Sequence, residues 1–240
     1  MPDRAAIVTG ASRGIGFALA DALGEAGYGV TVSARKPDTL AQAAEELRAK
    51  GYEVEDVAAN MADEDAIREV VARHRDRFGR LDVLVNNAGV GIGAAAADHQ
   101  TKFVDMQLDV NLRAIVLFYR ESLDMLRAAG AEHRNALVVN MASLAGKSPQ
   151  PWLSVYAATK AAVVAYTSAM NKELGSDGVK SVAFCPGFVD TDMTEFVRGT
   201  VPPEEMLRTT DITAALRFLL GVSPACVVPE IIFQRPGEAI

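Results

Sequence analysis

The sequence predicts a single α/β domain in which a doubly wound parallel sheet of seven strands carries helices on both faces. Short Val-rich runs alternate with longer segments rich in Ala, Leu, Glu and Arg along the whole chain. No linker or break in composition divides the chain, and a glycine-rich turn joins the first run to the first long segment. Because 240 residues suit one domain of this class, we expect the domain to span 1–240.

Seven apolar runs are the expected strands. They are too short for helices and rich in β-branched residues, as is typical of strands buried on both faces of a parallel sheet. In chain order they span 5–9, 29–34, 54–58, 83–86, 136–140, 179–185 and 227–233. The last of them is the expected seventh strand.

The segments between these runs carry apolar residues at helical spacing. In one of them, Ile67, Val70, Val71 and His74 recur three and four residues apart, as one face of a helix requires. The expected helices span 14–26, 37–50, 63–78, 102–129, 154–174 and 210–220. As crossovers between parallel strands, they would be right-handed and cover both faces of the sheet.

Charge and composition exclude several classes of partner. The net charge of -7 opposes binding to nucleic acids and to anionic membranes, and no cluster of Lys and Arg offsets it. No apolar run approaches the roughly 18–20 residues that cross a bilayer, and the first residues lack the pattern of a signal peptide. We therefore expect a cytoplasmic protein with a small-molecule ligand.

Cysteine usage indicates neither a disulfide framework nor a metal site. Cys185 and Cys226 lie far apart, and neither belongs to a CxxC pair or a His-rich segment. Cys185 precedes a proline at the end of a strand, and we expect it to be a small buried apolar side chain.

A glycine-rich turn follows the first strand and opens the first helix. It reads Thr9-Gly10-Ala11-Ser12-Arg13-Gly14-Ile15-Gly16. Glycine permits the sharp turn and lets a pyrophosphate approach the helix N-terminus, where N–H groups and the helix dipole favour an anion. The strand before it and the helix after it favour dinucleotide binding over a role in packing alone.

Further short motifs follow this turn along the chain. They are Asn86-Asn87-Ala88-Gly89 after the fourth strand, Asn111 in the next helix, Ser143 after the fifth strand, Tyr156-Ala157-Ala158-Thr159-Lys160 at the start of a helix, and Pro186-Gly187 with Thr191 after the sixth strand. Together with the TGxxxGIG spacing, they resemble the short-chain dehydrogenase/reductase family. The resemblance implies a Rossmann-type fold and an oxidoreductase that uses a nicotinamide nucleotide.

The end of the second strand favours NADP(H) as that nucleotide. In NAD-binding folds an acid at this position holds the ribose 2′-hydroxyl, and it would repel a 2′-phosphate. This chain has Arg35 and Lys36 there instead, and Arg13 lies in the glycine-rich turn. Arginine suits phosphate binding, although Arg35 and Lys36 could also be a solvated turn.

Tyr156 and Lys160 are the candidate acid–base pair. They lie four residues apart at the start of a helix, so their side chains leave the same face. A tyrosine pKa of about 10 is too high for efficient proton transfer at neutral pH, and a neighbouring ammonium group would lower it. We expect Lys160, with the positive nicotinamide of the oxidised cofactor nearby, to lower the pKa of Tyr156 in this way; an ordinary helical pair is the alternative.

The resemblance implies a role for each candidate catalytic side chain. Tyr156 would give a proton to a carbonyl that receives a hydride from NADPH, and Ser143 would hydrogen-bond the carbonyl oxygen. Lys160 would also hold the nicotinamide ribose, and Asn111 would keep a water that links the lysine to solvent. The residues expected to contact the cofactor are Gly10, Ser12, Arg13, Gly14, Ile15, Gly16, Arg35, Asn60, Met61, Asn87, Ala88, Gly89, Tyr156, Lys160, Pro186, Gly187, Val189 and Thr191.

Two other classes of function compete with this hypothesis. A hydrolase built on Ser143 would need a base, but the three histidines lie in or beside helical segments and no GxSxG motif is present. A non-catalytic NADP(H)-binding sensor or assembly protein would keep the fold. The presence of Ser143, Tyr156 and Lys160 together favours the enzyme.

Substrate choice and assembly are less constrained. The main expected substrate loop spans 188–208, with 90–100 and 144–153 beside it, and its apolar content favours a small, mainly apolar carbonyl compound. Small residues in helix 154–174 favour pairing with a second copy, so we expect a homodimer or homotetramer through this helix and 102–129. The C-terminal segment lacks the Asp-Gly-Gly of many family members, which leaves the choice between the two open.

Overall fold

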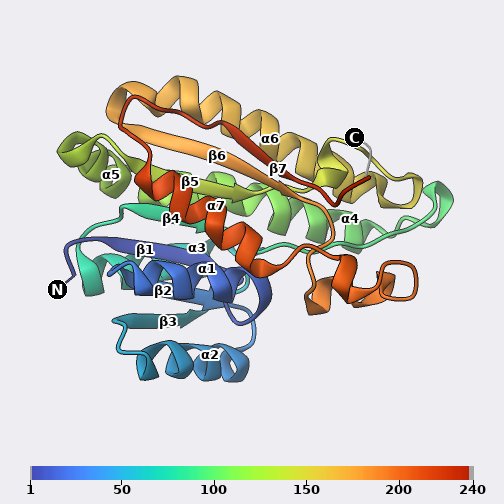
Figure 1. Ribbon diagram of the computed structural model, residues 1–240, viewed down its shortest axis with the longest axis horizontal. Helices are drawn as coiled ribbons and strands as arrows, with labels where there is room; N and C mark the ends of the chain where they lie inside the picture. The colour runs from blue at the N-terminus through green and yellow to red at the C-terminus, as the bar shows by residue number, and fades with distance from the viewer. Residues whose placement is uncertain (1, 238–240) are drawn as a thin grey trace.

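A computed structural model describes residues 2–237 of the chain. In this part of the chain, seven strands form one sheet in the order β3-β2-β1-β4-β5-β6-β7, and all neighbouring strands are parallel (Figure 1). The strands are β1 (Ala5–Thr9), β2 (Gly29–Ala34), β3 (Val54–Ala58), β4 (Val83–Asn86), β5 (Ala136–Met141), β6 (Val179–Pro186) and β7 (Glu230–Phe233). The predicted fold class is confirmed.

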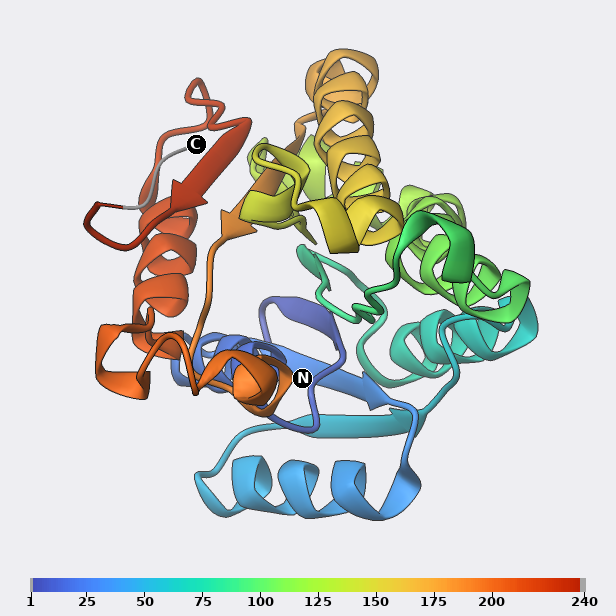
Figure 2. The ribbon, with the colours of Figure 1, turned by 90° about the vertical axis from the view of Figure 1, so that its right-hand side faces the viewer.

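Seven α-helices in the described residues cover both faces of this sheet. They are α1 (Gly14–Glu25), α2 (Pro37–Ala49), α3 (Glu64–Phe78), α4 (Thr101–Leu108), α5 (Ala114–His133), α6 (Ser154–Leu174) and α7 (Thr209–Gly221). In Figure 2, α3 and α5 lie on one side of the sheet and α7 on the other. None of the helices within residues 2–237 combines the length and the apolar character needed to cross a bilayer.

Two apolar cores, one on each face, hold the layers together. Alternate residues of a strand point to opposite faces, so Val8 packs toward α1, α2 and α7 while its neighbour Ile7 packs toward α3, α5 and α6. Cys185 is fully buried in the second core, as predicted.

The strand order reverses between β1 and β4. The chain builds outward from β1 to β3, and it then crosses to β4 and builds outward in the other direction. In sheets of this kind, ligands bind where the connections diverge, outside the carboxyl ends of the strands. The predicted site motifs all follow the carboxyl ends of strands or lie on the helices that come next, so the topology collects them at one edge.

The predicted helix 102–129 is wrong as a continuous α-helix. After α4, a five-residue π-helical turn spans Asp109–Arg113, and α5 then continues to His133, where Arg134 adopts a φ of 54°. A π turn keeps the chain helical and adds only one residue to one helical turn. The spacing of apolar residues in the sequence therefore does not reveal it. This turn contains Asn111, and π turns are frequent at functional sites.

The last strand is shorter than the predicted run 227–233. It begins at Glu230, directly after Pro229. Proline has no N–H to donate to a neighbouring strand, so it is excluded from the middle of a ladder. The strands β5 and β6 each extend one residue further than predicted.

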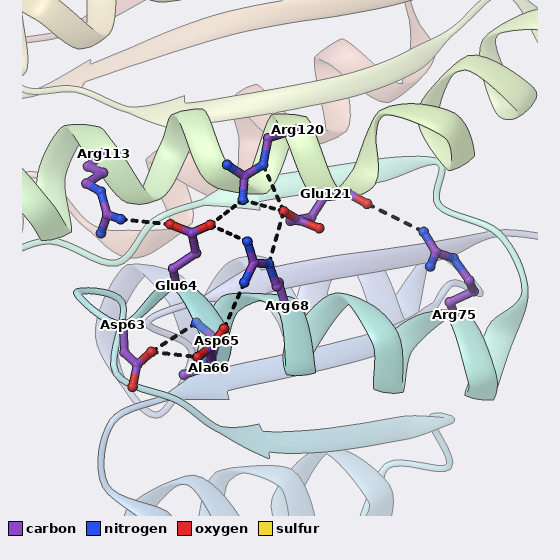
Figure 3. A network of polar contacts seen from close by, with 9 residues as sticks. All are labelled: Asp63, Glu64, Asp65, Ala66, Arg68, Arg75, Arg113, Arg120 and Glu121. Atoms are coloured by element: carbon purple, nitrogen blue, oxygen red, sulfur yellow. Dashed lines mark hydrogen bonds and ion pairs between the residues drawn. The ribbon is translucent and has the colours of Figure 1, made fainter.

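An ion-pair network joins α3 to α5 on the outside of the molecule (Figure 3). Glu64 accepts hydrogen bonds from Arg113 at 2.8 Å and from Arg120 at 2.7 Å, and the bond from Arg120 is the main cause that lowers the pKa of Glu64. Asp63 caps α3 by accepting from the N–H of Asp65 at 2.9 Å. Exposed pairs of this kind contribute little to stability, so the packing between the two helices depends mainly on their buried apolar residues.

Candidate active site

The glycine-rich turn between β1 and α1 has a backbone that only glycine tolerates. Gly10 and Gly14 have φ angles of 65° and 57°, in the left-handed region that side chains disfavour. A Cβ on Gly16 would overlap the carbonyl oxygen of Gly10. Because α1 begins at Gly14, its first N–H groups have no partner within the helix and can bind an anion that approaches this turn.

Thr9 locks the end of β1 to the loop that follows β4. Its hydroxyl oxygen accepts hydrogen bonds from the backbone N–H groups of Asn87 and Ala88, both at 3.0 Å. The Asn87 amide in turn donates to the carbonyl oxygens of Thr9 at 2.9 Å and Gly10 at 3.2 Å. Sequence reasoning did not select Thr9, although it belongs to the TGxxxGIG motif.

Asn86 is buried beneath this loop and does not reach its surface. Its amide donates to Asn140 Oδ1 at 2.8 Å, directly across the β4–β5 ladder. The Asn140 amide donates to the Tyr119 hydroxyl at 3.0 Å and to Thr167 Oγ1 at 2.9 Å. This polar network joins β4 and β5 to α5 and α6, so Asn86 helps to position the elements that carry the site.

The predicted nucleotide contacts on the other side of β1 are mostly exposed. Arg35 lies directly after β2, Asn60 lies shortly after β3, and both are exposed. The side chain of Met61, by contrast, is buried in the core that faces α3, so only its backbone could contact a ligand. Arg13 extends from the glycine-rich turn and pairs with Asp192 at 2.6 Å.

Ser143, Tyr156 and Lys160 come together at the carboxyl end of β5. The Ser143 hydroxyl accepts from the N–H of Ala145 at 3.1 Å and donates to the carbonyl oxygen of Pro186 at 3.5 Å, and it lies near enough to Tyr156 to affect the pKa of the phenol. The Lys160 ammonium donates to the carbonyl oxygen of Met141 at 2.7 Å, and its Nζ lies 5.6 Å from the centre of the Tyr156 ring. The structure therefore brings the three predicted catalytic side chains together.

Burial dominates the titration of this cluster. It raises the pKa of Tyr156 above its ordinary value, an effect that the nearby Ser143 hydroxyl only partly offsets. Burial also lowers the pKa of Lys160 to about 8. In the protein without ligands the pKa of Tyr156 is therefore raised, because desolvation is the larger effect and the Lys160 ammonium donates to the Met141 carbonyl, and the lowering expected beside the oxidised cofactor stays a prediction.

Asn111 clamps the loop after β4 onto α6. From the π turn, its side-chain oxygen accepts from the N–H of Val90 at 2.8 Å, and its amide donates to the carbonyl oxygen of Val90 at 2.9 Å and to Thr159 at 3.1 Å. A Cβ on Gly89 would lie 3.4 Å from both Asn111 Oδ1 and Lys160 Nζ. Asn111 thus sits next to the lysine, and its proposed water stays a prediction.

The predicted substrate loop 188–208 is folded and begins on the glycine-rich turn (Figure 2). Gly187, just after Pro186, donates to the carbonyl oxygen of Phe233 at 2.9 Å, and Val189 forms a bridge with Leu207. Thr191 begins the short helix Asp192–Val197, and a Cβ on Gly14 would lie 3.2 Å from its methyl group. The loop therefore approaches the glycine-rich turn at Thr191 and contacts the turn before α6 through Phe196 and Trp152.

Comparison with known proteins agrees with this geometry. The family model for short chain dehydrogenases matches residues 4–201. The 3-oxoacyl-(acyl-carrier-protein) reductase FabG of Staphylococcus aureus is 34% identical over 98% of this chain and 97% of its own length. An alcohol dehydrogenase from the archaeon Thermococcus sibiricus, complexed with 5-hydroxy-NADP, superposes with a TM-score of 0.86 at 30% identity over 98% of this chain and 99% of its own.

A second solved structure extends the comparison to the whole chain. The 3-ketoacyl-(acyl-carrier-protein) reductase from Brucella melitensis, complexed with NADH, superposes with a TM-score of 0.89 at 27% identity over 100% of this chain and 99% of its own. The order of the motifs along the chain and the strand order of the sheet agree with these matches. The chain therefore belongs to the short-chain dehydrogenase/reductase family of oxidoreductases.

Proposed function

We propose that this protein is an NADP(H)-dependent reductase of a small, mainly apolar carbonyl compound. The observation that carries the proposal is the convergence of Ser143, Tyr156 and Lys160 at the carboxyl end of β5, on the same edge of the sheet as the glycine-rich turn. When bound, the nicotinamide nucleotide supplies the hydride that the carbonyl carbon accepts and is itself oxidised. The protein supplies the proton, the orientation and the electrostatics.

The residues around the turn fit such a nucleotide. Side chains on Gly10 and Gly16 would collide with neighbouring protein atoms, so glycine is needed there for the turn to form, and the first N–H groups of α1 lie at this turn. Arg13 and Arg35 are both exposed, and we expect their guanidinium groups to hold a 2′-phosphate, Arg13 after it releases its pair with Asp192. Two related solved structures are complexes with NADP-type nucleotides, which supports the 2′-phosphate, and a third is a complex with NADH, which supports a nicotinamide nucleotide in general.

Tyr156 is the proposed proton donor. Because burial raises its pKa, its hydroxyl stays protonated at neutral pH and can donate to a carbonyl oxygen. Ser143, which lies beside it, would donate a second hydrogen bond to that oxygen as it gains negative charge. With a pKa of about 8, Lys160 is mostly protonated at pH 7 and would stabilise the phenolate that the transfer leaves.

The proposal predicts that the protein consumes NADPH in the presence of a carbonyl substrate. A panel of diketones, quinones, aldehydes and 3-oxoacyl thioesters is incubated with protein and NADPH, and NADPH absorbance is followed. We expect NADPH absorbance to decay with at least one carbonyl compound of the panel. With the same compound, NADH should be consumed more slowly than NADPH. Tight NADPH binding without decay across the panel would support the non-catalytic sensor instead.

Arg35→Ser is expected to weaken NADPH binding about tenfold and to leave NADH binding unchanged, because only NADPH carries the phosphate that this guanidinium would hold. Dissociation constants for both nucleotides can be measured by calorimetry. Arg77→Ser is the matched control, since Arg77 is an exposed arginine in the last turn of α3, paired with Glu53. Equal weakening of NADPH and NADH by Arg35→Ser would contradict the assignment.

We also propose that the protein forms a homodimer or homotetramer through α5 and α6. The support is the spacing of Ala161, Ala165 and Ala169, which are exposed on α6 at intervals of four residues. Residues spaced in this way share one face of a helix, and small side chains there allow a second helix to approach closely.

A further inference from the structure

Two exposed aromatic side chains touch each other near the candidate catalytic residues. Trp152 is 44% exposed and Phe196 is 63% exposed, and their ring centres lie 5.8 Å apart with an angle of 83° between the ring planes. Phe196 belongs to the folded substrate loop, and Met193 on the same short helix is also 55% exposed. Large apolar side chains that gather on a surface are typical of a binding site.

The position of Trp152 places this pair beside Tyr156. Trp152 lies in the short turn Pro151–Leu153 that leads directly into α6, four residues before Tyr156. The loop after β4 contacts both rings: a Cβ on Gly91 would lie 3.6 Å from two carbons of the Tyr156 ring, and a Cβ on Gly93 would overlap the indole of Trp152. Tyr156 and Trp152 therefore both lie against residues 91–93 of this loop.

Residues 93 and 94 hold Trp152 in place. The carbonyl oxygen of Trp152 accepts from the N–H of Ala94 at 2.9 Å, and the indole rests on Gly93, where any side chain would collide with it. Because Phe196 stands nearly perpendicular to the indole, the two rings form an open corner. A planar ring can stack on one wall of such a corner while its edge meets the other, and both are favourable aromatic geometries.

The charges next to this corner favour an uncharged ligand. Lys147, on the segment that precedes Trp152, is paired with Glu230 at 2.9 Å. Arg198, shortly after Phe196, is paired with Asp190 at 3.1 Å. Cations that are already paired attract an acidic carrier protein or a charged head group only weakly.

We propose that Trp152 and Phe196 form an aromatic corner that selects uncharged bicyclic ketones with one planar aromatic ring as substrates. The inference rests on the proposed reductase function, because it assigns the ketone that Tyr156 protonates. The corner contributes by binding the aromatic ring of the ketone, and it takes no part in proton transfer. Both walls would be needed, since that aromatic ring would contact Trp152 and Phe196 at once.

Trp152 is the only tryptophan in the chain, so its fluorescence reports directly on the corner. Wild-type protein saturated with NADP⁺, which cannot reduce a ketone, is titrated with 2-tetralone and with 2-decanone, an acyclic ketone of equal carbon count. We expect 2-tetralone to change the tryptophan fluorescence and to bind about tenfold more tightly than 2-decanone. A carrier-type ligand, the N-acetylcysteamine thioester of acetoacetate, is titrated in parallel.

A variant then tests the wall formed by Phe196. Phe196→Leu keeps an apolar side chain and is expected to reduce the preference for 2-tetralone to about twofold or less. Phe218→Leu, on α7, makes the same change at a phenylalanine that is 55% exposed, and it should keep the full preference. The proposed aromatic corner would be contradicted if Phe196→Leu kept the full preference for 2-tetralone over 2-decanone. It would also be contradicted if the thioester bound more tightly than 2-tetralone.

Turnover with NADPH separates this inference from the proposed function. The kcat/KM values of the same ketones are measured for wild type and for both variants. If 2-tetralone binds at Trp152 but neither it nor any carbonyl compound of the panel is reduced, the corner is supported and the reductase function fails. If 2-tetralone is reduced equally well by wild type and Phe196→Leu, the function stands and the corner fails.

Discussion

Tyr156→Phe is expected to lower kcat for carbonyl reduction by at least about a hundredfold, because it removes the hydroxyl that protonates the carbonyl oxygen. Phe fills the same space on α6 beside Gly91, so the fold and the glycine-rich turn stay intact. NADPH binding should therefore stay within about twofold of wild type, since the loss concerns the transition state alone. Steady-state kinetics with the best substrate and a titration of NADPH fluorescence measure the two quantities separately.

Tyr166→Phe provides the matched control for this loss. Tyr166 lies on the same helix, where its ring meets that of Tyr119 edge to face at 5.4 Å, and burial raises its pKa to about 12. It belongs to the packing between α5 and α6, so its hydroxyl should not affect kcat. If Tyr156→Phe kept more than about a tenth of the wild-type kcat, another group would have to supply the proton.

The strands and the glycine-rich turn could be predicted because their signals are local. The bounds of β1, β2, β3 and β4 match the predicted runs residue for residue, since Val-rich runs bounded by turns define buried strands within a few positions. The left-handed φ angles of Gly10 and Gly14 likewise follow from a motif that is continuous in sequence. The site residues on these segments could therefore be named without a structure.

Contacts between distant segments could not be predicted in this way. Arg13 was expected to face the cofactor, and nothing near it in the sequence indicates that it pairs with Asp192, 179 positions away. Gly93 shows no sign of its contact with Trp152, because a glycine in a loop has many possible causes. The direction of the Tyr156 shift depends on burial and on what Lys160 binds, and both are properties of the folded chain.

Acidification from about pH 7.5 to about pH 5 is expected to lower the free energy of unfolding by about 2 kcal/mol through His74 alone. His74 is fully buried: its Nε2–H donates to the carbonyl oxygen of Arg80 at 2.8 Å, and Nδ1 accepts from the Thr31 hydroxyl at 2.7 Å. Burial lowers its pKa to about 4. Only the unfolded chain, where a histidine pKa is about 6.5, binds a proton in this window.

The sign of the effect follows from this difference in proton binding. Because the folded-state pKa is depressed, the contribution is fully present above pH 6.5 and is lost progressively as the pH falls toward 4. Asp82 loses its contribution at lower pH: burial would raise its pKa, but the bonds from Arg80 and His133 lower it overall. Asp82 therefore adds little to the change expected above pH 5.

Comparison with His74→Gln isolates the histidine, because every other titrating group is common to both proteins. Glutamine keeps one donor and one acceptor but does not titrate, so the variant should be less stable at pH 7.5 and should lose less stability on acidification. Urea unfolding at a series of pH values gives both curves. The wild-type curve should be steeper between pH 7.5 and 5, and parallel curves would mean that the buried ring takes up its proton as readily as a solvated one.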